Sequence, residues 1–248
     1  MSHSGLRQGI VRTCREMNAK RLNQGTSGNL SCRIDGGMLI TPSGIAYDRM
    51  AAQDVVEMSI DGRCHRDRTP SSEWRFHRDI LAARPDVNVV LHSHSIYATS
   101  LAIHQRPIPA VHYMVAVGGG VDIRCAPYAC FGTQRLSDHV LAALQGRMAC
   151  LLAHHGLIVL ATSLEQAMWR LIEVETLAEM YVHALAIGEP PRLTEADMNE
   201  VFEQVKALNY GSGNGSATTA PPRNAEPPQG RIAERVAPGS ADLAGIAK

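Results

Sequence analysis

Apolar residues recur at helical spacing at the start of the chain and then gather in short runs. Over residues 5–24 they return every three or four positions, as in Leu6, Ile10, Cys14 and Met17, which predicts an amphipathic helix. A polar loop containing glycine follows this helix. The apolar runs after the loop predict strands at 29–34, 38–41 and 55–60.

The run Thr69-Pro70-Ser71-Ser72-Glu73 predicts the start of a helix that continues to Arg84. Threonine caps helices, proline suits the first helical position, and a carboxylate suits the positive end of the helix dipole. The remaining pattern predicts helices at 95–104, 133–144, 163–187 and 194–208, and strands at 87–94, 123–127 and 148–161, the last of these divided in two at 154–156.

The chain has 248 residues, which is enough for one substantial core. After Tyr210 its character changes, because residues 211–248 contain 11 Gly or Pro and no aromatic residue. Such a segment buries too little apolar surface to offset the entropy of ordering it. We therefore predict one domain over residues 1–210 and a disordered tail over residues 211–248.

Charge and hydropathy exclude several classes of partner. Lys and Arg number 24, as do Asp and Glu, so no basic field gathers nucleic acid. No apolar run reaches the roughly 20 residues that span a bilayer, and charged residues interrupt the N-terminus where a signal peptide needs an apolar core. The 6 cysteines include no C-x-x-C pair, which favours reduced thiols. We expect a cytoplasmic protein without nucleic-acid or membrane partners.

Histidines end two of the predicted strands. His92 and His94 lie two positions apart and so share one face of a strand. Of the adjacent His154 and His155 only one can point the same way, and the spacing does not say which. Glu73 adds a carboxylate, and such a set suits a tetrahedral zinc ion. With 11 histidines in the chain, a chance pairing is the alternative, and we assign no role to the others, His77 among them.

Small and polar residues form three segments suited to a phosphate. They are the loop 23–31, the loop 41–44, and the first turn of the helix predicted at Ser71 and Ser72. Free backbone N–H groups in such places attract anions, although each segment alone is more often an ordinary turn. The three lysines, Lys20, Lys206 and Lys248, lie on no apolar strand, which disfavours a Schiff base and leaves a metal ion as the electrophile.

Seven short runs together resemble the zinc-dependent class II aldolase family, and within it the fuculose type. The runs are 22–31, 39–44, 70–77, 92–94, 108–114, 125–128 and 154–156. The similarity extends in one register over residues 5–210, with Tyr210 itself aligned only after a shift of one residue. Position 43 departs from the fuculose type in having Ser for Thr, which keeps the hydroxyl group.

The resemblance implies a single three-layer α/β/α domain with a central, mostly antiparallel sheet, assembled as a homotetramer with active sites at subunit interfaces. It implies one Zn²⁺ per subunit, held by Glu73, His92, His94 and His155. The phosphate would be bound by Gly28, Asn29, Ser43, Gly44, Ser71 and Ser72. The aldehyde end would be bound by Thr26, Phe131 and Tyr210, with Tyr113 contributed by a neighbouring subunit.

The implied activity is cleavage of a ketose 1-phosphate to dihydroxyacetone phosphate and an aldehyde, with Glu73 and Tyr113 as catalytic residues. The substrate would be the 1-phosphate of L-fuculose, ribulose, a 5-deoxypentulose or methylthioribulose, the last placing the enzyme in methionine salvage. Alternatives on the same scaffold are a pentulose-phosphate epimerase and a methylthioribulose-1-phosphate dehydratase. A non-catalytic module like the adducin head domain is a more remote alternative, because such domains lack the metal ligands.

Overall fold

A computed structural model describes residues 3–64 and 68–208, all of which belong to the compact unit Met1–Gly213. The predicted tail and Tyr210 lie outside the described residues. The domain boundary at residue 210 therefore stays a prediction. No helix in the described part of the chain is long and apolar enough to cross a membrane.

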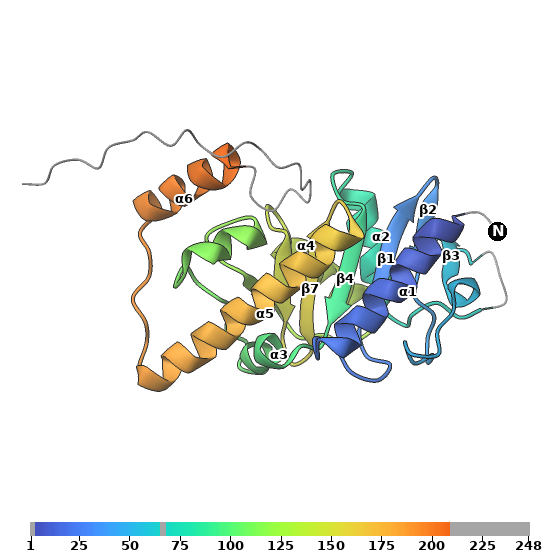
Figure 1. Cartoon of the computed structure of the whole chain (residues 1–248), viewed down its shortest axis with the longest axis horizontal. Coiled ribbons are helices and arrows are strands. Elements are labelled where there is room, and N and C mark those ends of the chain that lie inside the picture. The colour runs from blue at the N-terminus through green and yellow to red at the C-terminus, as the bar shows by residue number, and fades with distance from the viewer. Residues whose placement is uncertain (1–2, 65–67, 209–248) are drawn as a thin grey trace, which may run out of the picture. The chain divides into compact units, whose positions relative to one another are not determined.

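A single sheet of seven strands in the order β3-β2-β1-β4-β7-β6-β5 forms the centre of the domain (Figure 1). The strands are β1 Asn29–Ile34, β2 Gly37–Ile40, β3 Val56–Ser59, β4 Val89–Ser93, β5 Arg124–Ala126, β6 Ala149–Leu152 and β7 Gly156–Ala161. Every pair of neighbouring strands is antiparallel except β5 and β6. The predicted mostly antiparallel sheet is confirmed.

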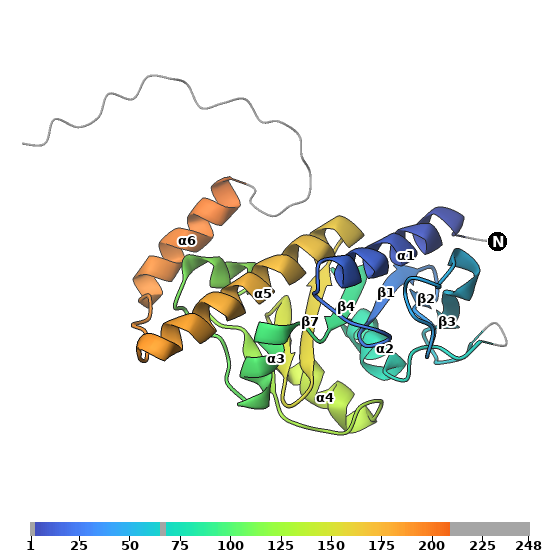
Figure 2. The same ribbon diagram turned by 60° about the horizontal axis from the view of Figure 1, so that its bottom comes forward.

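Helices cover both faces of this sheet (Figures 1 and 2). The α-helices are α1 Ser4–Ala19, α2 Trp74–Ala83, α3 Ile96–Ile103, α4 Gln134–Ala143, α5 Leu164–Ile187 and α6 Glu195–Ala207, and the 3₁₀ helices are η1 Ala52–Asp54 and η2 Tyr113–Gly118. Alternate residues of one strand point to opposite faces. On β4, Val89 and Leu91 enter the core under α1, α3 and α5, whereas Val90 enters the core under α2 and α4. The fold is thus a three-layer α/β/α domain, as predicted.

The apolar pattern located the strands and most of the helices to within a few residues. The first helix ends at Ala19 and not near residue 24, because Arg21 adopts a left-handed backbone with φ of 58°. Ser163 caps α5 as the sequence indicates, accepting a hydrogen bond from the backbone N–H of Gln166. Neither 3₁₀ helix was predicted, and η2 begins at Tyr113.

The predicted start of the helix at Thr69 is wrong. Residues 69–71 are extended and pair with the loop after β2. Ser43 N donates to the carbonyl of Thr69 at 3.0 Å, and Ser71 N donates to that of Thr41 at 2.9 Å. This pairing with a distant segment outweighs the local capping signal, so α2 begins only at Trp74. As a result two of the three segments predicted to bind a phosphate, the loop 41–44 and the segment at Ser71 and Ser72, lie side by side.

Candidate metal and substrate site

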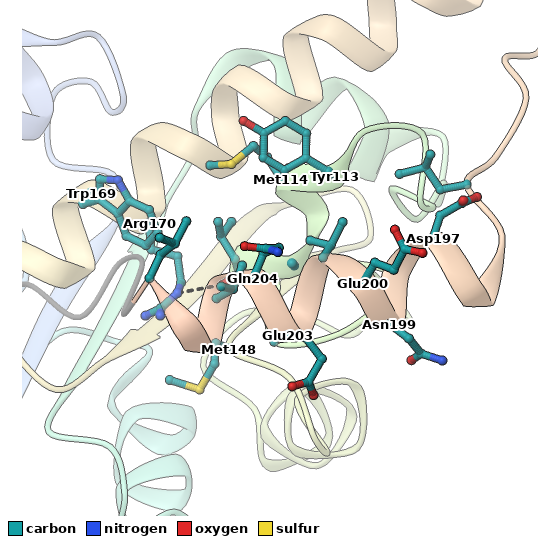
Figure 3. Close-up of a pocket in the computed structure, with 17 residues that line it drawn as sticks. Tyr113, Met114, Met148, Trp169, Arg170, Asp197, Asn199, Glu200, Glu203 and Gln204 are labelled. Atoms are coloured by element: carbon teal, nitrogen blue, oxygen red, sulfur yellow. Dashed lines mark hydrogen bonds between the residues drawn. The ribbon is translucent and has the colours of Figure 1, made fainter. Parts of the chain in front are cut away.

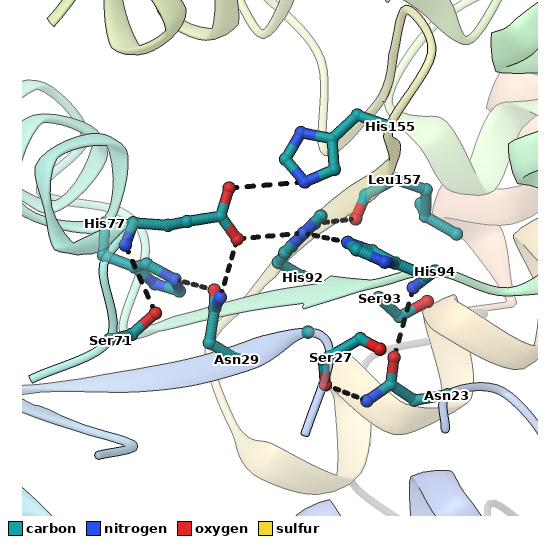
Figure 4. A network of polar contacts seen from close by, with 12 residues as sticks. Asn23, Ser27, Asn29, Ser71, His77, His92, Ser93, His94, His155 and Leu157 are labelled. Atoms are coloured by element: carbon teal, nitrogen blue, oxygen red, sulfur yellow. Dashed lines mark hydrogen bonds and ion pairs between the residues drawn. The ribbon is translucent and has the colours of Figure 1, made fainter. Parts of the chain in front are cut away.

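The end of β4 and the turn between β6 and β7 bring three imidazoles together. His92 Nε2 and His94 Nε2 are 3.0 Å apart, and one ring nitrogen from each of His92, His94 and His155 lies within 4.8 Å of the others. The three rings face one another edge-on, with centroids 4.8–4.9 Å apart (Figure 4). Such a cluster of nitrogen donors can hold a divalent metal ion.

Glu73 supplies the carboxylate that the sequence predicted beside these rings. It lies directly before α2, with its side chain directed at the imidazoles. Its Oε2 is 3.2 Å from His92 Nε2, and its Oε1 is 3.3 Å from His155 Nε2. The Asn29 amide donates a further hydrogen bond to Oε2 at 2.9 Å. Glu73 Oε1 is a buried oxygen without a hydrogen-bond donor among the described residues, as expected where a cation would neutralise it.

The electrostatics of the cluster suit a cation. Burial lowers the pKa of His94 to about 3 and that of His155 to about 4, with repulsion from the neighbouring rings in the same direction. Burial alone would raise the pKa of Glu73, but the imidazoles of His92 and His155 and the bond from Asn29 outweigh it and hold the pKa well below its usual value. Neutral imidazoles beside an ionised carboxylate are the protonation states that metal ligands require.

The backbone around the cluster settles which of the two adjacent histidines faces it. His154 adopts a left-handed backbone with φ of 56° and lies at hydrogen-bonding distance from Gln105, 3.1 Å away. The turn therefore directs His155 inward. Gly156 follows at the start of β7, where a Cβ would lie 2.4 Å from the Ser93 carbonyl oxygen. Only glycine lets β7 approach β4 this closely beside the histidines.

Two further contacts orient the rings. The Nδ1 of His92 donates to the carbonyl oxygen of Leu157 at 2.9 Å, which leaves Nε2 free of its proton and able to bind a metal. The backbone N–H of His94 donates to Asn23 Oδ1 at 3.3 Å. Asn23 also bonds the carbonyl of Ser27 in the glycine-containing loop. One asparagine thus connects the metal cluster to the predicted phosphate loop (Figure 4).

A cavity of about 360 Å³ opens onto the cluster. Most of the predicted substrate residues line it together with three of the predicted metal ligands, namely Thr26, Gly28, Asn29, Ser43, Gly44, Ser71, Ser72, Glu73, Phe131, His94 and His155. His92 lies beneath, fully buried. None of the described residues that line the cavity is Lys or Arg. An anion bound here would depend on backbone N–H groups, hydroxyl groups and the metal ion.

The loops that line this cavity present such donors. The backbone N–H groups of Gly28, Gly44 and Ser72 have no hydrogen-bond partner in the described part of the chain. Gly28 has a left-handed backbone with φ of 67°, and a Cβ there would lie 2.7 Å from the carbonyl oxygen of His92. Since only glycine fits, the loop can turn directly over the metal cluster. Ser72 presents its N–H group from the turn before α2, and not from the first turn of the helix as predicted.

Some predicted site residues lie elsewhere, and some site residues were not predicted. Tyr113 is half-exposed and lines a separate cavity of about 1030 Å³ between η2 and α6, together with Met114 and Trp169 (Figure 3). Tyr210 lies outside the described residues. The unpredicted members of the site are Tyr128 and His154, which line the smaller cavity, and Asn23 and His77, which act through hydrogen bonds.

The comparisons with known proteins agree with this geometry. The family model described as class II aldolase and adducin N-terminal domain matches residues 8–182. The chain is 47% identical to an L-fuculose phosphate aldolase of Escherichia coli O6:H1 over 212 residues, 85% of this chain and 98% of that protein. It is 48% identical to a 5-methylthioribulose-1-phosphate/5-deoxyribulose-1-phosphate aldolase of Rhodospirillum rubrum over 221 residues, 89% of this chain and 98% of that protein.

A solved structure named L-fuculose 1-phosphate aldolase superposes with a TM-score of 0.80 at 38% identity, covering 83% of this chain and 98% of that one. The match of the family model and the identity to these relatives show that the chain belongs to the class II aldolase and adducin N-terminal domain family. The resemblance expected from the seven sequence runs is confirmed.

Proposed function

We propose that this protein is a zinc-dependent aldolase that reversibly cleaves a ketose 1-phosphate to dihydroxyacetone phosphate and an aldehyde. The observation that carries the proposal is the convergence of Glu73, His92, His94 and His155 at the end of a cavity lined by unpaired backbone N–H groups. An adducin-like module needs no such cluster. The names of relatives at 47% and 48% identity favour aldol cleavage over the epimerase and the dehydratase.

Zinc is the metal that this ligand set fits best. Tetrahedral ligands at the usual zinc distance of about 2.0–2.1 Å lie about 3.3 Å from one another. The pairs His92–His94, Glu73–His92 and Glu73–His155 are separated by 3.0, 3.2 and 3.3 Å. Neutral imidazoles and one carboxylate match zinc chemistry, and the three ligand histidines would keep the ion if Glu73 moved away from it. When bound, zinc acts as a Lewis acid for the charge that develops on the substrate oxygens.

The protein's own residues divide the remaining work. The N–H groups of Gly28, Gly44 and Ser72 and the hydroxyls of Ser43 and Ser71 hold the phosphate and fix the position of the sugar chain. Bound in this way, the phosphate anchors the substrate with its reacting carbons against the metal cluster. The rings of Phe131 and Tyr128, both exposed at the cavity, present an apolar wall to the aldehyde end.

Glu73 is the residue we assign to proton transfer at carbon 3 of the sugar. Glu73 lines the cavity, and its buried Oε1 has no hydrogen-bond donor among the described residues, so we assign the proton to this oxygen. In the cleavage direction Glu73 delivers that proton to carbon 3, and in the condensation direction it removes it. The Tyr113 hydroxyl handles the proton on the carbon-4 oxygen.

Tyr113 requires a second subunit for this role. It lines a different cavity from Glu73 in the same chain, and half of its surface is exposed. We infer a homotetramer with active sites at subunit interfaces. In each site Thr26, Phe131 and Tyr210 shape the aldehyde pocket, and Tyr113 of a neighbouring subunit completes it. We also propose that the enzyme works in the cytoplasm, where its sugar-phosphate substrate is found.

The substrate is tested with a panel of ketose 1-phosphates, scored by release of dihydroxyacetone phosphate. The panel contains the 1-phosphates of L-fuculose, ribulose, 5-deoxyribulose and methylthioribulose. We expect release from several of them, with the highest kcat/KM for the member whose carbon-5 substituent is apolar, because the aldehyde wall is aromatic. Failure of every member to release dihydroxyacetone phosphate with zinc present would contradict the proposal.

A further inference from the structure

A buried histidine lies directly behind the carboxylate of Glu73. His77, one turn further along α2, has no exposed surface. Its imidazole contacts two side chains of β1. The Nδ1 is 2.8 Å from Ser31 Oγ, and the Nε2 is 2.5 Å from Asn29 Oδ1. Asn29 in turn donates from Nδ2 to Glu73 Oε2 at 2.9 Å. Ser31, His77, Asn29 and Glu73 therefore form one continuous chain of hydrogen bonds, of which Figure 4 shows the contact between His77 and Asn29.

The ionised carboxylate of Glu73, at one end of this series of hydrogen bonds, fixes the direction of each of them. An ionised carboxylate can only accept, so the Asn29 N–H group must face Glu73 and the Asn29 oxygen must face His77. That oxygen also can only accept, so His77 carries its proton on Nε2. The Nδ1 of a neutral imidazole is then an acceptor, and Ser31 donates to it. Burial keeps the ring neutral, lowering the pKa of His77 to about 3.

We propose that His77 is a positioning residue for Glu73, acting through the Asn29 amide. The Nε2–H group of His77 holds the amide oxygen of Asn29 on the side away from Glu73. In the reversed orientation this oxygen would lie against the Glu73 carboxylate, and neither group could donate a hydrogen bond to the other. Asn29 thereby holds Glu73 by Oε2 alone and leaves Oε1 without a donor among the described residues. The two carboxylate oxygens thus have separate tasks. Oε2 is anchored by Asn29, whereas Oε1, 3.3 Å from His155 Nε2, accepts no hydrogen bond from the described residues and carries the proton. The inference rests on the role proposed above for Glu73.

Two substitutions at His77 test the roles of the two ring nitrogens separately. The amide nitrogen of Gln lies near the position of Nε2, so His77→Gln can still donate to Asn29. The amide of Asn lies near the position of Nδ1, so His77→Asn keeps the contact with Ser31 and loses that with Asn29. We expect kcat of the zinc-loaded His77→Gln enzyme within about threefold of wild type. For His77→Asn we expect kcat lower by about 10- to 100-fold, the usual effect of losing such a partner.

The KM of both variants should stay within about twofold of wild type, because the phosphate loops are untouched. A matched control is Ser137→Ala. Ser137 is also fully buried, and it bonds Asp79 on the same helix α2 at 2.6 Å, outside the chain to Glu73. This control should lose stability while keeping kcat. Equal kcat values for His77→Asn and His77→Gln would overturn the positioning role, and so would a Ser137→Ala variant that loses as much kcat as His77→Asn.

A spectroscopic measurement tests the same arrangement without turnover and without a variant. In a long-range ¹H–¹⁵N spectrum of the zinc-free protein at neutral pH, the His77 ring should be neutral, with its proton on Nε2. A proton on Nδ1 would reverse the chain and overturn the inference even if His77→Asn fails to fold. A wild-type enzyme that cleaves no ketose 1-phosphate would overturn the proposed function. Normal wild-type turnover with equal rates in both His77 variants would overturn only the role of His77.

Discussion

Glu73 contacts the imidazoles of His92 and His155 and the Asn29 amide, and it also lines the cavity. A carboxylate in that position can serve as a metal ligand and as a proton carrier, and substitution separates the two roles. The Glu73→Gln side chain keeps the size and can still meet Asn29, but it cannot hold a proton on an ionised oxygen.

For Glu73→Gln we predict a loss of about 10²-fold or more in turnover, the usual scale for a general base. Bound zinc should remain near one ion per subunit, because the three ligand histidines are unchanged. Turnover is measured by release of dihydroxyacetone phosphate, and zinc by elemental analysis. The control is Glu179→Gln, at an exposed pair with His183 on α5, which should keep both turnover and zinc. Undiminished turnover in the Glu73 variant would remove this residue from the mechanism.

The buried His77 also makes stability depend on pH. Its folded pKa is lowered to about 3, against about 6.5 for an unfolded histidine. Between these values the unfolded chain takes up a proton and the folded chain does not. Stability is therefore fully present above pH 6.5 and decreases as the pH falls, by up to about 1.4 kcal/mol per pH unit for this residue.

Urea unfolding of the zinc-free protein at pH 6.0 and 5.0 measures this term. On lowering the pH, the wild type should lose about 1 kcal/mol more of its free energy of unfolding than His77→Gln, which has no titrating group at this position. The other histidines titrate alike in both proteins and cancel in the difference. An identical loss in the two proteins would mean that residue 77 is not held neutral in the fold.

Local patterns identified some site residues and not others. His92 and His94 were found because a strand sets residues two apart on one face, a rule that needs no knowledge of the fold. The choice of His155 over His154 depends on a left-handed turn that spacing does not reveal. His77 and Asn29 are 48 positions apart in sequence, so their contact becomes visible only when α2 is packed against β1.

At the scale of elements, α3 is held at its start by a side chain of α5. Glu175 accepts three hydrogen bonds, from Ser95 Oγ at 2.6 Å, from Tyr97 N at 2.8 Å and from Ala98 N at 2.9 Å. A carboxylate at this place satisfies free N–H groups and the helix dipole. Because Ser95 directly follows His94, the cap also fixes the segment at the end of β4 that carries two of the proposed metal ligands.

Glu175→Ala should lower the free energy of unfolding by roughly 2–3 kcal/mol, since it removes the cap and leaves the buried hydroxyl of Ser95 without its acceptor. Urea unfolding measures the loss. Glu179→Ala, one turn further along α5 at the surface, should change stability by less than about 0.5 kcal/mol. Equal stabilities of the two variants would show that the cap contributes nothing.

The strands could be predicted because apolar runs bounded by turn residues are a local signal. The order of the strands in the sheet could not be derived from those runs, since it depends on pairings such as that of β1 with β4, about 60 residues apart along the chain. The start of α2 was misplaced for the same reason. A bridge between Pro42 and Pro70 keeps the segment extended where its composition alone favours a helix.

At the scale of the whole molecule, the positions of Glu73 and Tyr113 in separate cavities make a prediction about assembly. If each active site combines Glu73 of one subunit with Tyr113 of another, mixed oligomers contain some sites with both residues intact. Co-expression of Glu73→Gln and Tyr113→Phe chains should then yield more turnover than either variant alone. The mass in solution, by light scattering, should be about four times the 26.9 kDa of the chain.

The control for this experiment is to mix the purified variants without exchange of subunits, which should give only the sum of the two residual activities. Co-expressed oligomers with no more than that sum would contradict shared active sites. A monomeric mass with full activity would contradict them as well, because Tyr113 would then have to reach Glu73 within its own chain.

The central claim is that one metal ion held by Glu73 and the three ligand histidines makes carbon–carbon cleavage possible. It is tested most directly by titrating zinc into the chelator-treated protein while recording release of dihydroxyacetone phosphate from a ketose 1-phosphate. We predict no release from the metal-free protein, and release that rises with zinc and levels off at one ion per subunit. His94→Ala should remain inactive at that zinc concentration. Undiminished release from the metal-free protein would contradict the account.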